Sequence, residues 1–507
     1  MLGRTTGAVL VGVEACLVDV EVHLGGGLPN IAAVGLANSS VREGIDRIRA
    51  ALSHSGFKLP QHRVTVNLAP ADIRKEGASL DLPIAAAILA ADGRLGGAPA
   101  RDIVLAGELA LDGAVRPVRG VLAIALAARA AGCRGVLVPR ANFAEAALVP
   151  DLLVWPASSL ADAIALLKDP SRIAVPPAER AAEDAETPDP PGEDLGDVRG
   201  QHVARRALEV AAAGGHHLLL TGPPGSGKTM LARRLPGILP PLAHEEALEV
   251  TRVWSAAGLA SGLVRRRPFR APHHGVSLAG LIGGGQALRP GEIALANGGV
   301  LYLDELTEFR RDALEALRQP LESGDVTVVR LHARAVFPAR FMLVASMNPC
   351  PCGWHGDPRS RCRCTPNEVR RYQAKLSGPL LDRFDLAVEV PAVDPVDLSS
   401  AAAGEASAAV RDRVQAARER QRSRFGPLGP ASNARMERAE LEQHAVLAHA
   451  PKRLLVTACR RLGLTARGYD RVRRVARTLA DLDACDVILD RHVAEAVQYR
   501  RVVNAQP

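Results

Sequence analysis

The chain has 507 residues, 47% of them hydrophobic but only 3% aromatic, and 63 Lys and Arg against 55 Asp and Glu give a formal net charge of +8. A chain of this length predicts about three domains, and its composition excludes a disordered or collagen-like protein. No uncharged apolar run reaches the ~20 residues of a membrane-spanning helix, and the first residues carry no export signal. We therefore expect a soluble, cytoplasmic protein without a membrane partner.

The first 170 residues are expected to fold as one α/β or α+β domain. Short β-rich runs such as Ala8–Val13 and Arg63–Leu68 alternate there with Ala-rich helical runs such as Val121–Ala131, and this alternation is typical of mixed folds. Residues 171–194 are rich in Pro and acidic side chains and have little to bury. They predict an extended, solvated linker, which leads to a second α/β domain at 195–395.

A glycine-rich segment of the second domain predicts a phosphate site. It fits the pattern G-x-x-x-x-G-K-[ST] and lies between an apolar strand that ends at Thr221 and a predicted helix. Glycines let backbone N–H groups turn toward phosphate oxygens, the Lys228 ammonium balances the β- and γ-phosphates, and the Thr229 hydroxyl is a ligand for Mg²⁺. The predicted nucleotide contacts are Gly222, Pro223, Pro224, Gly225, Ser226, Gly227, Lys228 and Thr229.

Two later apolar strands end in polar side chains. Residues 299–303 lead into Asp304 and Glu305, and Phe341–Met347 leads into Asn348. At the carboxyl edge of a parallel sheet, the first acid can hold Mg²⁺ through water and the second can polarise the attacking water. The Asn348 amide could orient that same water. Together with the phosphate loop, these residues predict hydrolysis of the nucleotide rather than binding alone.

Two basic segments of the second domain are candidates for contact with a nucleic acid. Residues 325–340 predict a hairpin with Arg330, His332 and Arg334 at its turn, and residues 265–274 carry further Arg and His side chains. Cations on such a hairpin could track a phosphate backbone. The alternative for each segment is a solvated basic face, but two basic segments in one domain favour a nucleic acid over a protein as the partner.

Four of the eight cysteines fall in one short stretch. Cys350 and Cys352 follow Asn348 directly, and Cys362 and Cys364 form a second pair. In a reducing compartment such thiols are not expected to form disulfides, and four thiolates can close a tetrahedral zinc site. A single residue between paired cysteines strains chelation, so a structural zinc and a metal-free cysteine-rich loop both remain open.

Residues 396–507 are predicted to be all-helical. Apolar side chains recur there at helical spacing. The segments are Ala408–Arg424, Pro451–Leu462, Gly468–Leu482 and Asp490–Arg500. We expect these helices to form a lid on the second domain.

The order of phosphate loop, Asp-Glu strand, Asn strand and helical C-terminus resembles that of the AAA+ ATPases. Several longer segments are more specific and resemble the magnesium-chelatase-like AAA+ family, most closely its ComM/YifB competence-protein subfamily. They are VRGQ at 198–201, FRAPHHGVSLAGLIGGG at 269–285, RPGEIALANGGVLYLDEL at 289–306, LSGPLLDRFDL at 376–386 and LTARGYDRVRRVARTLADL at 464–482. The resemblance covers nearly the entire chain.

This resemblance implies an AAA+ P-loop core, ATP and Mg²⁺ as cofactors, and a homohexameric ring. Arg383 looks like the arginine finger that reaches the γ-phosphate of a neighbouring subunit, and Arg467 looks like the sensor-2 arginine of the lid. Gln201 matches the segment that lies against the adenine. From their residue type alone, both arginines could equally be surface ion pairs. With Asp304, Glu305 and Asn348 they complete the set of catalytic candidates.

The resemblance further implies an ATP-driven DNA motor similar to branch-migration helicases, which act on homologous-recombination intermediates during natural transformation. Its partners would be single-stranded and branched DNA. The alternative is a chaperone-like remodelling ATPase of magnesium-chelatase type that acts on a protein, although such motor subunits usually lack an N-terminal module like this one. A noncatalytic DNA-binding scaffold is disfavoured by the intact set of hydrolytic residues.

The first domain resembles the Lon-protease type, a ribosomal S5 domain 2-like fold. Residues 74–81, RKEGASLD, match the stretch that holds the nucleophilic serine, here Ser79, and the longer segment 66–85, VNLAPADIRKEGASLDLPIA, also matches the ComM/YifB subfamily. Such a serine needs a nearby base, which is a lysine in that family, and alignment of residues 117–122 places Leu122 at its position. The lysines of this domain are Lys58, Lys75 and Lys168. We expect a proteolytically inactive module in which Ser79 is structural.

Overall fold

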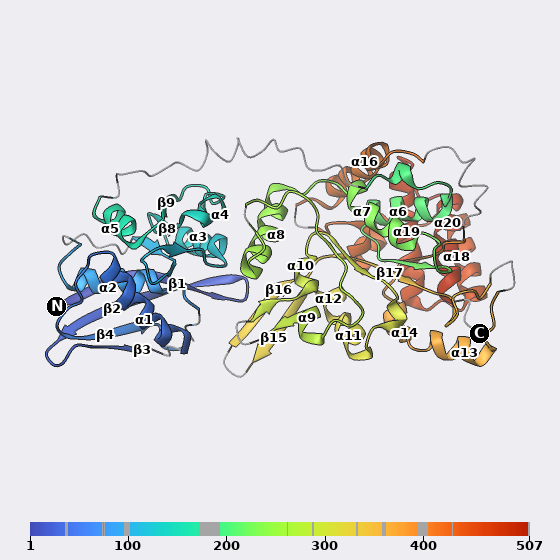
Figure 1. The fold of residues 1–507 in the computed structure, drawn as a ribbon. Helices are drawn as coiled ribbons and strands as arrows, with labels where there is room; N and C mark the ends of the chain where they lie inside the picture. Colours follow the sequence, from blue (N-terminus) through green and yellow to red (C-terminus); the bar gives the residue numbers. More distant parts are fainter. Residues whose placement is uncertain are drawn as a thin grey trace.

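In the computed structural model the chain forms two units that lie side by side, with residues 1–171 at the left of Figure 1 and residues 193–504 at the right. The described residues are 1–35, 39–73, 75, 77–95, 102–169, 171, 193–260, 262–285, 288–330, 333–356, 361–392, 404–427 and 429–504. Most of the predicted linker at 171–194 lies outside them. No helix in these ranges is both long and apolar enough to cross a membrane.

The N-terminal unit is built on a mixed sheet of seven strands in the order β3-β4-β2-β1-β5-β8-β9. Its strands are β1 (Leu2–Val11), β2 (Glu14–Gly25), β3 (Asn30–Val34), β4 (Arg63–Ala69), β5 (Ile103–Leu105), β8 (Gly135–Pro139) and β9 (Leu153–Ala157). A separate small hairpin joins β6 (Glu108–Leu109) to β7 (Val115–Arg116). The predicted strand at Ala8–Val13 was placed too far along the chain, because all of Leu2–Val11 pairs with β2.

Helices cover both faces of this sheet. One core lies between the sheet and α1 (Ser39–His54), α2 (Asp81–Ala91) and α5 (Leu160–Lys168). A second core lies on the opposite face, beneath α3 (Val121–Ala130) and α4 (Phe143–Ala146). Successive residues of β5 and β8 alternate between the two cores, as the two-residue period of a strand requires. The mixed α/β character expected for this part of the chain is confirmed.

The C-terminal unit is centred on a five-stranded, all-parallel sheet in the order β11-β14-β17-β10-β18. The strands are β10 (Leu218–Thr221), β11 (Phe269–Arg270), β14 (Val300–Leu303), β17 (Met342–Met347) and β18 (Leu386–Glu389). Because all run in the same direction, their carboxyl ends lie at one edge of the sheet. The three central strands end at the phosphate loop, at Asp304 and at Asn348, so this edge gathers the predicted catalytic residues.

Short helices and two hairpins surround the parallel sheet. The helices are α6 (His202–Gly214), α7 (Lys228–Ile238), α8 (His244–Ala257), α9 (Leu278–Ile282), α10 (Glu292–Leu295), α11 (Arg311–Ala316), α12 (Arg318–Ser323), α13 (Pro366–Gln373) and α14 (Gly378–Leu381). One hairpin pairs β12 (Gly283–Gly284) with β13 (Arg289–Pro290), and the other pairs β15 (Asp325–Arg330) with β16 (Ala333–Pro338). The hairpin predicted at 325–340 is therefore present.

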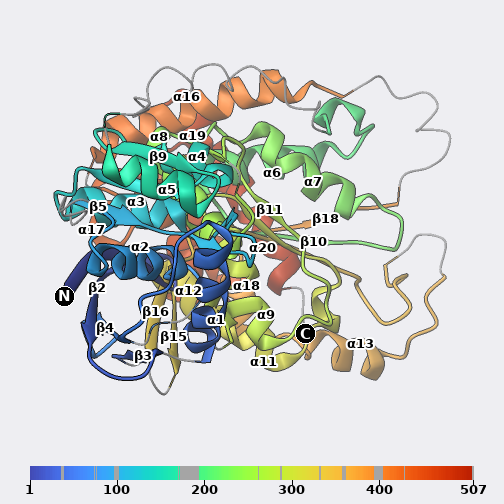
Figure 2. The same ribbon diagram turned by 60° about the vertical axis from the view of Figure 1, so that its left-hand side comes forward.

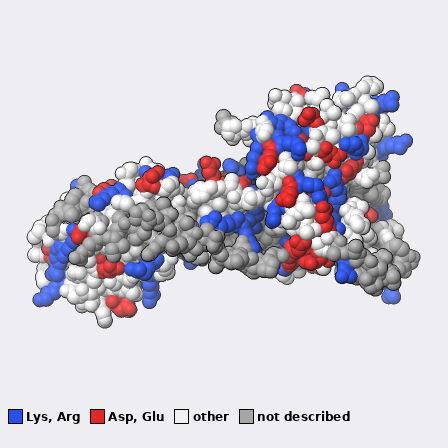
Figure 3. Space-filling view, turned by 90° about the horizontal axis from the view of Figure 1, so that it is seen from above, with Lys and Arg blue, Asp and Glu red and all other residues white. Residues whose placement is uncertain are grey.

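The described residues after 403 are helical, apart from connecting turns, as the sequence predicts. The helices are α16 (Ser407–Phe425), α17 (Arg438–His444), α18 (His449–Leu462), α19 (Ala466–Leu482) and α20 (Asp490–Asn504). They share one hydrophobic core with α6, α7 and the parallel sheet, and Figure 2 shows α16 along the outside of this layer. On the face seen in Figure 3, basic side chains lie among acidic ones and form no continuous basic surface.

Among the described residues, the N-terminal unit contacts α8 and the second hairpin of the C-terminal unit. The Gly120 N–H, at the start of α3, donates to the Ser255 carbonyl of α8 over 3.2 Å. The turn between β1 and β2 reaches the second hairpin, where Val13 belongs to the same apolar cluster as Ala335 and Phe337 of β16. The N-terminal unit therefore supports one strand of the basic hairpin.

Candidate nucleotide and DNA sites

The phosphate loop lies between β10 and α7, in the position that its motif predicts. Gly225 and Gly227 have φ of +75° and +91°, a region that glycine adopts at little cost. Lys228 is the first residue of α7, and its ammonium donates to the carbonyls of Gly222 and Pro223 over 2.7 and 2.9 Å. Burial lowers the pKa of Lys228, although the Asp304 and Glu305 carboxylates oppose that shift.

The residues of this loop fit a bound nucleotide phosphate. The hydroxyl oxygen of Ser226 is buried and has no hydrogen-bond partner among the described residues. A buried hydroxyl without a partner is costly unless a ligand satisfies it. The N-terminus of α7 adds unpaired backbone N–H groups and a partial positive charge, which favour an anion.

The Mg²⁺ ligands predicted from the sequence lie in contact. The Thr229 hydroxyl donates to Asp304 Oδ2 over 2.8 Å. Ser346 of β17 donates to the other carboxylate oxygen of Asp304, and the Tyr302 hydroxyl donates to Thr229 over 3.2 Å. Burial alone would raise the pKa of Asp304, but the hydrogen bonds from Ser346 and Thr229 outweigh it and lower that pKa. The carboxylate is thus held ionised, as a metal ligand must be.

Glu305 projects from a strained turn beside this pair. It has φ of +53°, which is uncommon for a residue with a side chain. Its carboxylate lies 3.8 Å from Nδ1 of His274, in the segment after β11, and its side chain is 56% exposed. Asn348 approaches from the next strand, and its side-chain oxygen accepts a hydrogen bond from Lys228 over 3.3 Å. The structure thus brings together Lys228, Asp304, Glu305 and Asn348.

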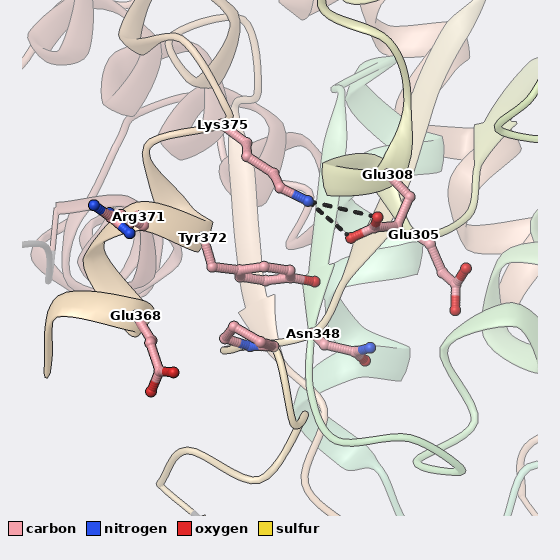
Figure 4. Close-up of a pocket in the computed structure, with 8 residues that line it drawn as sticks. Glu305, Glu308, Asn348, Glu368, Arg371, Tyr372 and Lys375 are labelled. Carbon is pink, nitrogen blue, oxygen red and sulfur yellow. Dashed lines mark hydrogen bonds and ion pairs between the residues drawn. The ribbon is translucent and has the colours of Figure 1, made fainter. Parts of the chain in front are cut away.

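Glu305 and Asn348 open onto a cavity of about 440 Å³. Figure 4 shows both side chains at its mouth, with Tyr372 and Lys375 forming the wall contributed by α13 and the turn after it. Lys375 pairs with Glu308 over 3.2 Å, and the Thr307 hydroxyl donates to the Tyr372 hydroxyl over 2.6 Å. This wall was not predicted, because no local pattern links residues 305–308 with 372–375.

Gln201 connects the phosphate loop to the last strand of the sheet. Its backbone has φ of +51°, and its side-chain amide donates to the carbonyl of Pro391, after β18, over 2.7 Å. The same amide donates to the Ser226 carbonyl over 3.3 Å. The structure thus places Gln201 beside the phosphate loop, and the contact with adenine that the resemblance implies stays a prediction.

The two arginines implied by the resemblance lie together and away from their own phosphate loop. Arg383 follows α14 and is 9% exposed, and its guanidinium pairs with Glu322. Burial lowers the pKa of Arg383, and the positive charges of Arg471 and Arg467 add to that shift. Arg467 itself is exposed in the first turn of α19. Among the described residues, no hydrogen bond or ion pair joins either arginine to residues 222–229.

A buried polar network that the sequence did not predict holds the segment of Arg383. Asp385 contacts Nδ1 of His216, ahead of β10, at 3.3 Å and Nε of Arg471, from α19, at 3.5 Å. Arg500 of α20 donates to the Phe384 carbonyl over 2.6 Å. Burial would raise the pKa of Asp385, but His216 and Arg471 hold it well below its usual range. The segment of Arg383 is thereby tied both to the sheet and to the C-terminal helices.

The four clustered cysteines converge. All four sulfur atoms lie within 4.8 Å of one another. The Sγ atom of Cys350 lies 3.4 Å from that of Cys352 and 3.8 Å from that of Cys362, and the last two lie 3.6 Å apart. Backbone N–H groups of Trp354 and Arg363 lower the pKa of Cys352, which favours a thiolate.

The basic hairpin has its arginines in the open. Arg330 and Arg334 are both exposed near the turn, while His332 lies outside the described residues. The second basic segment differs from the expectation, because Arg267 pairs with Glu246 at 3.1 Å and Arg270 pairs with Glu292 at 2.7 Å. These two cations are neutralised by carboxylates some 20 residues away, so they add little to a DNA-binding surface.

In the N-terminal unit the polar residues of the serine motif are bonded internally. The Ser79 hydroxyl donates to the Ala8 carbonyl over 2.9 Å. Lys75 is fully buried, and its ammonium donates to the Pro70 carbonyl. Leu122, at the position where the resemblance would place the base, is buried in the core beneath α3. None of these contacts pairs Ser79 with a base.

Comparison with known proteins agrees with this arrangement. Family models described as magnesium chelatase subunit ChlI match residues 194–398 and 20–142, and the model of its C-terminal part matches 404–500. The protein named YifB of Salmonella typhimurium is 46% identical over 97% of this chain and 96% of its own length. The competence protein ComM of Haemophilus influenzae is 44% identical over the same shares.

The chain belongs to the magnesium-chelatase-like ComM/YifB family. Membership implies an AAA+ ATPase that uses ATP and Mg²⁺. The 38 kDa subunit of magnesium chelatase from Cereibacter sphaeroides is a more distant relative, 28% identical over 38% of this chain and 57% of its own length. The ComM/YifB relatives thus match nearly the whole chain, whereas that chelatase subunit matches well under half of it.

Proposed function

We propose that the protein is an ATP-driven DNA motor that acts on single-stranded and branched DNA as a homohexameric ring. The observation that carries the ATPase part is the assembly of Lys228, Thr229, Asp304, Glu305 and Asn348 at one edge of a parallel sheet. When bound, Mg²⁺-ATP supplies a phosphate that is open to attack by water. Lys228 and the loop bind this phosphate, Thr229 and Asp304 hold the metal, and Glu305 with Asn348 orients and polarises the water.

The position of Arg383 supports the proposed ring. This arginine contacts Glu322 and Pro379 rather than the phosphate loop, which is compatible with a role in a neighbouring subunit. An arginine supplied from a neighbour stabilises the charge that develops during phosphoryl transfer. Arg467 lies close enough to Arg383 for its charge to lower the pKa of Arg383. In a closed ring, each nucleotide would contact the phosphate loop of one subunit and Arg383 of its neighbour.

DNA is favoured as the substrate for two reasons. The exposed Arg330 and Arg334 lie at the tip of a hairpin whose strand β16 is contacted by the N-terminal unit, and exposed cations of this kind bind a phosphate backbone. A relative 44% identical over nearly the full length is named a competence protein. We propose branch migration of recombination intermediates during DNA uptake as the process served.

The experiment is a displacement assay on a four-way junction with one labelled strand. With ATP and Mg²⁺ the protein should convert the junction to two duplexes, and a non-hydrolysable analogue should give none. A protein that hydrolyses ATP but leaves every branched substrate intact would contradict the DNA motor.

A remodelling ATPase that acts on a protein is the second candidate. It is favoured by the pairing of Arg267 and Arg270 with carboxylates, which removes part of the basic surface expected from the sequence, and by the family description. Under this alternative ATP turnover would be indifferent to DNA and would rise with a protein substrate.

The N-terminal unit is proposed to be a Lon-type module without protease activity, and the C-terminal helices a lid. Ser79 donates a hydrogen bond to a backbone carbonyl, and no hydrogen bond between Ser79 and a basic side chain is found among the described residues. The helices α19 and α20 contact the finger segment through Arg471 and Arg500. Both proposals treat these regions as supports for the nucleotide site.

Structural zinc is proposed at the four cysteines. A regular tetrahedron with a Zn–S distance of ~2.3 Å places its sulfur atoms ~3.8 Å apart. The sulfur atoms of Cys350, Cys352 and Cys362 lie 3.4 to 3.8 Å from one another, and that of Cys364 lies within 4.8 Å of them. An iron–sulfur cluster would have to fit its own iron and sulfide atoms between the cysteines, and this spacing leaves no room for them. Four cysteines also leave no open coordination position, so the role is structural.

A further inference from the structure

The four-cysteine centre lies directly against the phosphate loop. A Cβ atom at Gly353, next to Cys352, would come within 2.5 Å of Cδ of Pro224 in that loop. At the start of the same segment, Asn348 accepts the hydrogen bond from Lys228. The segment 348–353 therefore contacts the phosphate loop at two points, one through a side-chain amide and one through close packing.

The second pair of cysteines leads into a different wall of the site. Cys364 is followed by Thr365, whose hydroxyl caps the N-terminus of α13. The far end of α13 carries Tyr372, which accepts the hydrogen bond from Thr307 near Glu305. An ion shared by the two pairs of cysteines would join the segment of Asn348 to this helix and so fix both walls of the catalytic cavity.

We infer that the cysteine centre is a zinc-dependent brace of the nucleotide site, so that metal occupancy controls the binding and hydrolysis of ATP. This inference rests on the proposed ATPase function. Thiols form only weak hydrogen bonds. The Arg361 guanidinium over the Trp354 ring, 3.5 Å from its centroid, and the Arg363 N–H at Cys352 already link the two pairs, and zinc would add four metal–sulfur bonds to these contacts. With zinc bound, Asn348 and the packing on Pro224 are held in place for the phosphate.

The coupling must act in both directions. If zinc favours the loop conformation that binds nucleotide, then nucleotide favours retention of zinc by the same factor. This reciprocity provides a readout that does not depend on catalysis, because zinc release can be followed while a non-hydrolysable analogue is bound. The same reasoning gives Pro224 a role separate from metal binding, since it touches the brace but contributes no ligand.

The experiment measures zinc release from the full-length protein purified without chelator. Elemental analysis should give one zinc per chain. A colorimetric chelator should remove that zinc about fivefold or more slowly in the presence of Mg²⁺ and adenylyl imidodiphosphate than without them. The zinc-free protein should keep its circular dichroism spectrum, hydrolyse ATP up to about 10²-fold more slowly because Asn348 is no longer held in position, and recover on addition of zinc. Release that is equally fast with and without the analogue would overturn the inference.

Two kinds of variant distinguish the zinc ligands from the packing contact at Pro224. Cys362→Ser combined with Cys364→Ser should lose zinc, whereas the matched pair Cys133→Ser and Cys459→Ser, outside the cluster, should keep it. Pro224→Ala should keep one zinc per chain but lose the protection given by saturating analogue. If the protein with Cys362→Ser and Cys364→Ser fails to fold, the rate of zinc release from Pro224→Ala still tests the inference. Release that the analogue slows as much as in the parent would contradict it.

Failure of the proposed ATPase function and failure of the zinc brace give different experimental results. A zinc-loaded protein that is protected by the analogue but never turns over ATP would contradict the proposed ATPase and leave the brace standing. A protein that hydrolyses ATP equally fast with and without zinc would overturn the brace alone. Freely titratable thiols and no zinc in the purified, active protein would overturn it as well.

Discussion

The phosphate loop and the serine motif of the N-terminal unit both resemble known catalytic segments, yet their polar groups have different partners. At the nucleotide site Lys228 reaches Asn348, and Thr229 reaches Asp304, so functional groups contact one another across strands. In the N-terminal unit Ser79 bonds to the Ala8 carbonyl, within its own backbone framework. The difference teaches that a resemblance to a catalytic motif indicates chemistry only where the fold also brings the partner groups into contact.

The largest effect is expected at Arg383, which we propose completes the nucleotide site of a neighbouring subunit. Arg383→Ala should lower ATP turnover about 10³-fold or more, because the charge of the transition state loses its partner. Steady-state hydrolysis measures the loss, with Arg310→Ala, an exposed arginine paired to Asp312, as the control.

Mixing then tests whether Arg383 acts between subunits. Arg383→Ala protein combined with Lys228→Ala protein should recover part of the activity, because some interfaces pair an intact loop with an intact finger. No recovery in subunits that are shown to exchange would contradict the ring.

Glu305→Gln should stall hydrolysis while leaving nucleotide bound. Loss of a general base typically costs 10²–10⁴-fold, and we expect about 10³-fold here because Glu305 faces the cavity beside Asn348. Glu308→Gln is the matched control, since it removes the same charge from the same cavity but from a residue paired with Lys375. Equal turnover in Glu305→Gln and the parent would remove this residue from the mechanism.

The hairpin predicts a smaller, salt-dependent effect. Replacing Arg330 and Arg334 by Ala should weaken DNA binding and flatten its dependence on salt by up to about one unit of slope per lost phosphate contact. Fluorescence anisotropy at several salt concentrations measures it, and basal ATP turnover should persist. The control pair Arg310→Ala and Arg438→Ala removes exposed arginines from other elements, and equal losses in both pairs would return the hairpin to a solvated basic face.

The smallest effect is expected at the serine that lacks a base. Ser79→Ala should leave ATP turnover unchanged and cost about 1 kcal/mol of stability, the value of one hydrogen bond. Thermal unfolding and a peptidase assay measure these quantities. A peptidase activity in the parent that the substitution abolishes would break the comparison between the two sites.

Much of the nucleotide site is predictable because its residues lie in contiguous motifs at strand ends, as Lys228, Asp304 and Asn348 do. Groups that reach the site from elsewhere are not predictable in this way. Ser346 joins Asp304 only because β17 lies next to β14, and Arg471 joins Asp385 only because α19 packs against the sheet. Neither residue period nor spacing encodes those neighbours.

The fold shows the same division. Some elements were foreseen from their periodicity, among them β4, α3 and four of the C-terminal helices, but the start of β1 was not, because its first residues become a strand by pairing with β2. Arg267 and Arg270 were candidates for contact with a nucleic acid, and no local pattern indicates that Glu246 and Glu292 lie within reach of them. Local patterns predict elements, whereas charge pairing depends on the assembled structure.

The most direct test of the DNA motor is ATP turnover by the parent protein, measured side by side without DNA and with single-stranded, duplex and branched DNA. Glu305→Gln serves as the blank in every condition. We predict measurable basal hydrolysis that rises with single-stranded and branched DNA and is abolished in the blank. Hydrolysis that no DNA changes, or that persists in Glu305→Gln, would contradict the account.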